Sequence, residues 1–154
     1  MSYVRHVLQP GETVVQESRL HWLIYWRAIL FLIIAAILAL LSRQPSDATA
    51  AEAILAAAAL ALLVALISAI AAAIRRATTE LAVTNHRIIY KSGLFSRHTI
   101  EMNRAKVESV DVDQSLLGRF LGYGTVLVRG TGGSLEPLRG IENPLSLRSH
   151  ITVG

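Results

Sequence analysis

The sequence predicts an α+β membrane protein in which a transmembrane helical hairpin precedes a small antiparallel β domain closed by a C-terminal helix. Two long apolar segments in the first half predict the hairpin, and short β-prone runs separated by Gly and Asn predict the β domain. The chain of 154 residues is 53% hydrophobic and 17% charged. This balance is typical of a small membrane protein rather than of a globular enzyme.

The first apolar segment, residues 23–41, contains one charged residue, Arg27, close to its start. The guanidinium can reach the headgroup region while the stem of the side chain stays in the hydrocarbon. Trp22, Tyr25 and Trp26 lie at the same end, as aromatic residues do at a bilayer interface. We therefore predict a membrane span here; a buried core helix that begins with aromatic residues is the alternative.

The second apolar segment, residues 53–74, has no charge and consists of Ala, Leu, Ile and Val with one Ser. At ~1.5 Å per residue, such a helix is long enough to cross a hydrocarbon core of ~30 Å. It ends at Arg75 and Arg76, a basic pair typical of the cytoplasmic end of a span. The polar connector between the two spans, residues 42–52, is predicted to lie outside the cell.

Basic residues before the first span and after the second outnumber those in the connector, which carries one Arg against two acids. This bias places both termini in the cytoplasm, with residues 1–22 as an N-terminal cytoplasmic segment, and predicts a multi-pass protein of the cell membrane. A signal-peptidase site at Ala48–Ala50 is the alternative. Cleavage there would remove far more than the ~15–30 residues of a signal peptide.

The second half of the chain, residues 78–154, is predicted to form about six short strands and two short helices. Alternating apolar positions and turn residues place the strands at 80–84, 87–91, 98–102, 106–112, 123–129 and 134–138. In the fourth run the valines share a face only if a bulge shifts the register at Ser109. One helix is expected over 115–121, and a terminal helix over 143–151 with Asn143 as N-cap and Pro144 at its first position. The lack of crossover helices between the strands argues against a parallel α/β sheet.

Three motifs in this sequence resemble those of a known family. The run Val110–Val128, which contains S-L-L-G-R-F-L-G-Y-G, resembles the core motif of bacterial membrane proteins with a pleckstrin-homology-like (PH-like) domain. The run Leu81–Ile89, with Thr84-Asn-x-Arg87, resembles the opening hairpin of that domain, and Leu8–Glu12 followed by His21-Trp22 and two spans is similar to the family layout. The resemblance covers nearly the whole chain. It implies a split β-barrel capped by the C-terminal helix and no catalytic residues, because the family has no established activity.

No group of residues has the spacing of a catalytic or metal site. The five His are far apart, and no Ser lies in a Gly-x-Ser-x-Gly elbow. The Gly-rich run 130–134 lacks the Lys and Ser/Thr of a phosphate-binding loop. Asp111 and Asp113 share a strand face, where they could hold a cation, form a solvated edge or cap the helix near Ser115. We expect no enzyme activity, no metal and no cofactor.

Basic residues near the membrane are candidates for contact with anionic lipid. They are Arg75, Arg76, Arg97, Arg104 and Lys106. Each such contact is worth ~1 kcal/mol near a charged surface. Because the Asn85–His86 turn is too short to cradle a headgroup, non-specific contact or plain solvation is expected rather than specific recognition. The basic residues are also scattered, which argues against nucleic acid as a partner.

A stripe of small residues runs along the second span. Its members recur every four residues: Ala53, Ala57, Ala61, Ala65, Ala69 and Ala73. Such a stripe lets helix backbones approach closely in lipid, where the hydrophobic effect between helices is absent. The facing helix is either the first span, through Ala35 and Ala39, or a second copy of the protein.

Together these features predict a non-enzymatic integral membrane protein that displays a cytoplasmic PH-like domain for protein contacts or self-association. Its expected partners are the lipid bilayer, an unidentified membrane or cytoplasmic protein, and a second copy of itself. The alternative is a sensor of anionic lipid at the cytoplasmic leaflet. A transporter or channel is disfavoured, because neither span has an interior acid or a Gly or Pro break.

Overall fold

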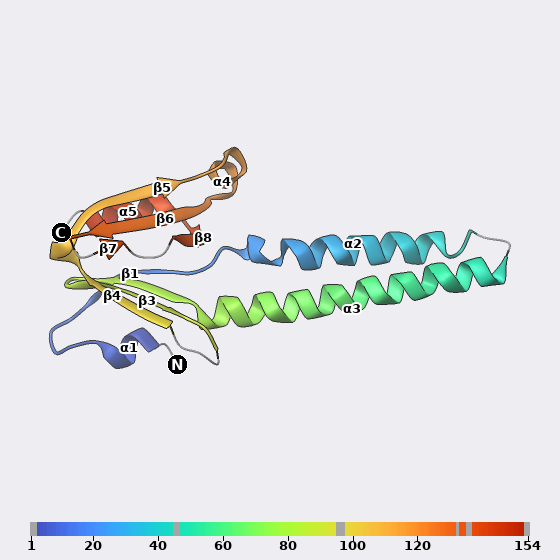
Figure 1. Ribbon diagram of the computed structural model, residues 1–154, viewed down its shortest axis with the longest axis horizontal. Coiled ribbons are helices and arrows are strands. Elements are labelled where there is room, and N and C mark those ends of the chain that lie inside the picture. The colour runs from blue at the N-terminus through green and yellow to red at the C-terminus, as the bar shows by residue number, and fades with distance from the viewer. Residues whose placement is uncertain (1–2, 45–46, 95–97, 132, 135–136, 153–154) are drawn as a thin grey trace. The chain divides into compact units, whose positions relative to one another are not determined.

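The computed structural model describes residues 3–44, 47–94, 98–131, 133–134 and 137–152. The chain divides into two compact units (Figure 1). One unit is Trp22–Ile74, and the other combines Met1–His21 with Arg75–Gly154. The first unit is helical, and the second, which we call the β unit, holds the described strands.

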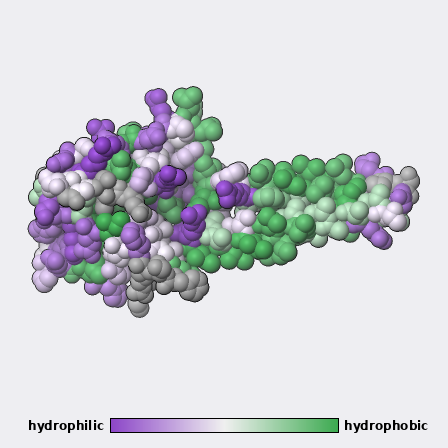
Figure 2. Space-filling model, viewed as in Figure 1, coloured by the Kyte–Doolittle hydropathy of each residue, from purple (hydrophilic) through white to green (hydrophobic). Residues whose placement is uncertain are grey.

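The helical unit is a hairpin of two long helices. A 3-10 turn, η1 (Trp22–Tyr25), leads into α2 (Trp26–Leu41), and α3 (Ala48–Thr78) runs back. Both helical stretches are long and apolar enough to cross a membrane. Figure 2 shows their hydrophobic surface, which large Leu and Ile side chains form. The buried residues are small: Ala28, Ala35, Ala58, Ala61, Ala65 and Ala72.

Helix α3 extends beyond the predicted apolar segment, residues 53–74, at both ends. At its start the Asp47 carboxylate accepts hydrogen bonds from the Thr49 N–H (3.2 Å) and hydroxyl (2.7 Å), as an N-cap residue does. Ala, the strongest helix former, then fills most of the first turn. At the other end the helix continues through the basic pair to Thr78. The connector is therefore shorter than the predicted 42–52.

Two antiparallel sheets make up the β unit. The first sheet has the order β1–β2–β3–β4, with strands Val14–Ser18, Glu80–Thr84, Arg87–Ser92 and His98–Asn103. The second sheet is centred on β6, and its strands are β5 (Val107–Asp113), β6 (Tyr123–Gly130), β7 (Gly133–Ser134) and β8 (Leu138–Glu142). The turn η2 (Arg104–Lys106) leads from β4 into β5, and a bridge between Leu20 and Ile141 joins the sheets beyond the end of β1.

The core of the β unit lies between the two sheets and is closed by α5 (Pro144–Thr152). Its buried members are Leu81, Val83, Ile88, Val110, Val126, Val128, Leu138, Ile141, Leu147 and Ile151. On the outer face of the first sheet, Val4 of α1 (Tyr3–Val7) packs on Ala82 and Ile89. Strand β2 is thus buried on both faces, because α1 covers the face that the core does not.

Most strands lie within a residue or two of their predicted positions, and the bulge near Ser109 is confirmed by a register shift between Val107 and Ser109. Two elements differ. The predicted strand 134–138 includes residues 135–136, which lie outside the described residues; Ser134 ends β7, and Leu138 begins β8, which continues to Glu142. Residues 1–22 are not a separate segment, because β1 pairs with β2. Helix α4 (Leu116–Leu121) and α5 match the two predicted helices closely.

Candidate functional site

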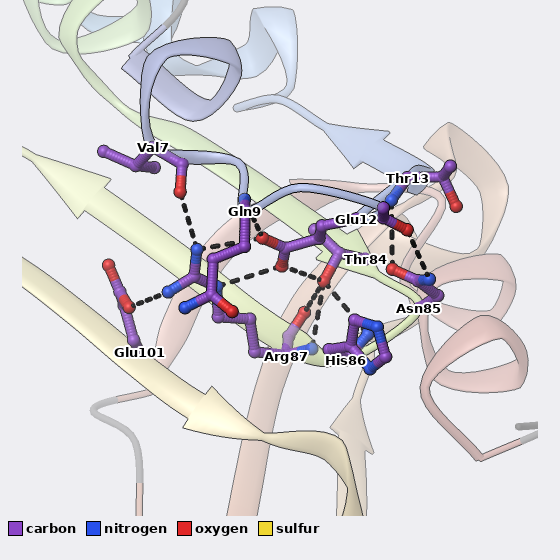
Figure 3. Close-up of polar contacts among 10 residues, drawn as sticks. Val7, Gln9, Glu12, Thr13, Thr84, Asn85, His86, Arg87 and Glu101 are labelled. Atoms are coloured by element: carbon purple, nitrogen blue, oxygen red, sulfur yellow. Dashed lines mark hydrogen bonds and ion pairs between the residues drawn. The ribbon is translucent and has the colours of Figure 1, made fainter.

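The N-terminal segment is tied to the first sheet by a network of polar contacts, shown in Figure 3. It begins with a tight turn in which the Glu12 N–H donates to the Gln9 carbonyl at 2.9 Å. Pro10 and Gly11, the latter at φ 84°, occupy the second and third positions, as a type II turn requires. The Gln9 N–H also donates to Glu12 Oε2 at 2.8 Å. The turn therefore fixes the Glu12 carboxylate, which is buried.

The opposite half of the network is the turn between β2 and β3. Thr84 Oγ1 accepts from the N–H groups of His86 (3.2 Å) and Arg87 (2.9 Å), which closes this turn. Asn85 fastens it to the N-terminal segment, since its N–H donates to the Thr13 carbonyl at 3.1 Å and its Oδ1 accepts from the Thr13 N–H at 3.0 Å. Asn85 and His86 themselves are exposed.

The two turns meet in an ion pair. Arg87 binds both oxygens of Glu12, with Nε to Oε1 and Nη2 to Oε2 each at 2.9 Å. The Thr84 hydroxyl donates to Glu12 Oε1 at 2.7 Å. The guanidinium also donates to Glu101 Oε2 (2.6 Å) and to the Val7 carbonyl (2.7 Å). We call Glu12, Thr84 and Arg87 the N-terminal clasp.

The protonation state of the clasp is fixed by its own contacts. Burial by itself raises the pKa of Glu12, but the hydrogen bonds from Arg87, Gln9 and Thr84 and the charge of Arg87 together lower it to about 2. The hydrogen bond with Glu12, together with the charges of Glu101 and Glu12, raises the pKa of Arg87 above its ordinary value. Among the described residues, no buried side-chain nitrogen or oxygen lacks a hydrogen-bond partner. The clasp is therefore a saturated ion pair, suited to fastening a segment rather than to proton transfer.

The basic residues predicted to contact lipid lie in different places. Arg75 is exposed and Arg76 half-buried near the end of α3, Lys106 is exposed at the end of η2, and Arg97 lies outside the described residues. Lipid contact by any of them stays a prediction.

The Arg104 side chain makes hydrogen bonds to backbone carbonyls within the β unit. It is half-buried, and it donates to the carbonyls of Thr84 (3.2 Å) and His150 (2.7 Å). A third, longer contact reaches the Ile151 carbonyl. The last carbonyls of a helix carry the negative end of its dipole. Arg104 thus fastens the end of α5 to the turn after β2.

The alanine stripe and the buried face of α3 overlap only in part. Of the stripe, Ala61 and Ala65 are buried, Ala69 is half-buried, and Ala53, Ala57 and Ala73 are exposed. The buried residues Ala58, Ala65 and Ala72 are instead seven apart, as are Ala28 and Ala35 of α2. A seven-residue spacing keeps to one side of a helix with 3.6 residues per turn, whereas a four-residue spacing drifts around it.

The remaining candidates from the sequence have simpler surroundings. Asp111 lies 3.1 Å from Arg129 in an exposed ion pair, and Ser115 accepts from the Gly118 N–H as the N-cap of α4. No group of three or more His, Asp and Glu in the described part of the chain could hold a metal ion.

Comparison with known proteins identifies the family of this chain. The family model for the bacterial PH domain matches residues 22–152. The chain belongs to the bacterial PH domain family. The matched part of this bacterial PH domain protein includes α2, α3 and strands β2 to β8, while α1 and β1 precede it. Searches of curated proteins and of solved structures gave no match.

Sequence reasoning did not foresee the clasp. Both of its motifs were identified as family signatures, but nothing in the sequence alone put them in contact. The available signal was chemical: an acid directly after Pro-Gly, and an Arg that begins an apolar β-prone run. Charged residues are seldom buried without a partner of opposite charge.

Proposed function

We propose that this bacterial PH domain protein is a multi-pass protein of the cell membrane, anchored by α2 and α3, with both termini in the cytoplasm. The length of the helices and their exposed Leu and Ile side chains support a lipid environment. Arg75 and Arg76 at the end of α3 support the orientation. In this proposal the two sheets and α5 form a split β-barrel at the cytoplasmic surface.

We further propose that the domain acts by binding protein, either a partner or a second copy, and not by catalysis. The observation that carries this proposal is the open edge of the second sheet. Among the strands that the structure describes, β5 pairs with β6 alone, and α5 packs along it. An edge strand offers unpaired N–H and C=O groups to which an extended peptide can add as another strand. Glu108 and Asp113 stand exposed on this edge.

Photo-crosslinking in cell membranes tests this proposal. A photoreactive residue in place of Glu108 or Asp113 of the full chain should form adducts with protein, and an adduct of twice the chain mass would identify self-association. The matched control is His86, which is also exposed but lies in the turn of the first sheet. Equal adducts from His86, or none from the β5 edge, would contradict the proposal.

The second candidate function is sensing of anionic lipid, favoured by exposed Arg75 and Lys106 and a net charge of +4. Lipids that remain bound to the purified full chain, measured by mass spectrometry, separate the two functions. A sensor would retain one anionic headgroup over others of equal charge, and Arg75→Gln with Lys106→Gln would abolish that preference. Retention that follows charge alone would count against a sensor.

A further inference from the structure

The short helix α4 exposes its apolar side chains and buries a glycine. Leu116, Leu117 and Phe120 are 75%, 67% and 87% exposed, whereas Gly118 is buried. In Figure 2 a hydrophobic patch marks the place that α4 takes in Figure 1, at the end of the β5–β6 hairpin. A helix that only covered a core would have the opposite arrangement.

This arrangement is fixed by the backbone contacts of α4. A Cβ on Gly118 would lie 2.7 Å from the Tyr123 carbonyl oxygen, so no larger residue fits there without a shift. The Gln114 amide donates to the same Tyr123 oxygen at 2.9 Å, and Gly122, at φ 74°, ends the helix. The glycine side is thus bound to β6. Positions 116 and 117 lie one turn before positions 120 and 121, so these four residues share the remaining side of the helix.

Helix α4 lies at the end of the β unit where the chain leaves for the helical hairpin. The ring of His21, the residue before Trp22, stacks on Tyr123 with ring centres 5.3 Å apart. The His21 N–H also donates to the Gly140 carbonyl at 2.8 Å. Strand β2 starts at the same end, since Ser18 of β1 pairs with Leu81. Both connections to the apolar hairpin therefore leave the β unit at the end where His21 contacts Tyr123, two residues after α4.

We propose that α4 is an interfacial lipid-binding element whose Leu and Phe side chains enter the cytoplasmic leaflet beside the hairpin. The inference rests on the proposed function, in which α2 and α3 span that bilayer. Apolar side chains bind a membrane surface by entering the boundary between headgroups and acyl chains. Arg119, exposed in the middle of the helix, is placed to meet anionic headgroups. Contact of α4 with the bilayer would hold the β unit in one orientation on the membrane.

Depth measurements on the full chain test this proposal, and the absence of native Cys makes them direct. Single variants Phe120→Cys, Thr131→Cys and Leu63→Cys are labelled with the environment-sensitive fluorophore NBD in vesicles of phosphatidylethanolamine and phosphatidylglycerol. Nitroxide-labelled acyl chains in matched vesicles then quench any fluorophore in contact with them. Thr131 is the matched control, because it is exposed at the opposite end of β6, about 26 Å from α4 for eight residues at ~3.3 Å each. Leu63 reports on α3.

The proposal expects blue-shifted emission and strong quenching at positions 120 and 63, with neither at 131. Replacing Leu116 and Leu117 by Ser should reverse the shift at 120 and leave that at 63 unchanged. Quenching at 63 without quenching at 120 would overturn the role of α4 and keep the membrane span. Loss of quenching at both would overturn the span and α4 together. Blue-shifted but unquenched emission at 120 that weakens on dilution of protein in lipid would assign this face to a second copy, which also overturns the proposal.

Discussion

Replacing Glu12 by Gln should release the N-terminal segment from the first sheet. The substitution keeps the size of the side chain but removes the charge that binds Arg87 Nε and Nη2 and the Thr84 hydroxyl. Because folding lowers the pKa of Glu12 from 4.5 to about 2, the clasp contributes roughly 3 kcal/mol at neutral pH, at 1.36 kcal/mol per pKa unit. Breaking a buried ion pair costs ~3–5 kcal/mol, and Arg87 retains Glu101 and the Val7 carbonyl, so the lower figure applies.

Hydrogen–deuterium exchange of the full chain in lipid nanodiscs measures this loss locally. A loss of about 3 kcal/mol raises the open fraction roughly a hundredfold, so amides of β1 and of the turn at Gln9 should exchange about that much faster in Glu12→Gln. Helices α2 and α3 should exchange as in the wild type. Glu101→Gln is the matched control, because Glu101 is more exposed than Glu12 and its ion pair with Arg87 is worth ~1 kcal/mol or less. Unchanged exchange of β1 in Glu12→Gln, or an equal effect of Glu101→Gln, would refute the role of the clasp.

Three further changes have defined outcomes. Since folding depresses the pKa of Glu12, the stability that its ion pair contributes is present above pH ~4.5 and is lost as the pH falls towards 2. The protection of β1 amides from hydrogen exchange, corrected for the intrinsic rate, should therefore fall over this interval in the wild type but not in Glu12→Gln. Gly118→Ala should cost ~1–3 kcal/mol through overlap with the Tyr123 carbonyl, seen as faster amide exchange over 115–123, and exchange there that matched the wild type would contradict this close contact. Arg104→Met should destabilise the attachment of α5 by ~1.5–3 kcal/mol, because the charged hydrogen bonds of Arg104 are lost, and amides of residues 144–152 should exchange faster. Exchange of these residues that matched the wild type would contradict this role of Arg104.

The helices and most strands were predictable because their signals are local. An apolar segment, alternation along a strand, and Gly or Asn at a turn each depend on neighbouring residues in the sequence. Strand β1 was not predictable on this basis, because Val14–Ser18 is short and polar and becomes a strand only by pairing with β2, far along the chain. The shift of the last strand to β8 has a related cause, since β8 pairs with the start of β6 rather than with its end.

The site was less predictable than the fold. The sequence identified the Thr84–Arg87 turn and the turn that ends at Glu12 as family motifs, but their ion pair depends on α1 and β1 folding onto the first sheet. Arg104 was a candidate for lipid contact, and its hydrogen bonds could not be foreseen, because the carbonyls to which it donates belong to residues distant in sequence. Side-chain exposure on α4 likewise could not be inferred from its composition, because the apolar face of a short helix packs inward in most domains.

The central claim is a helical hairpin that crosses the membrane and displays the β unit in the cytoplasm, and cysteine labelling of intact cells tests it most directly. Gln44→Cys, in the connector, and Glu108→Cys, on β5, are both exposed and stand in a chain without native Cys. A membrane-impermeant maleimide should label position 44 in intact cells and position 108 only after the membrane is permeabilised. Labelling of 108 in intact cells with 44 protected would invert the topology, and protection of both until permeabilisation would contradict a spanning hairpin.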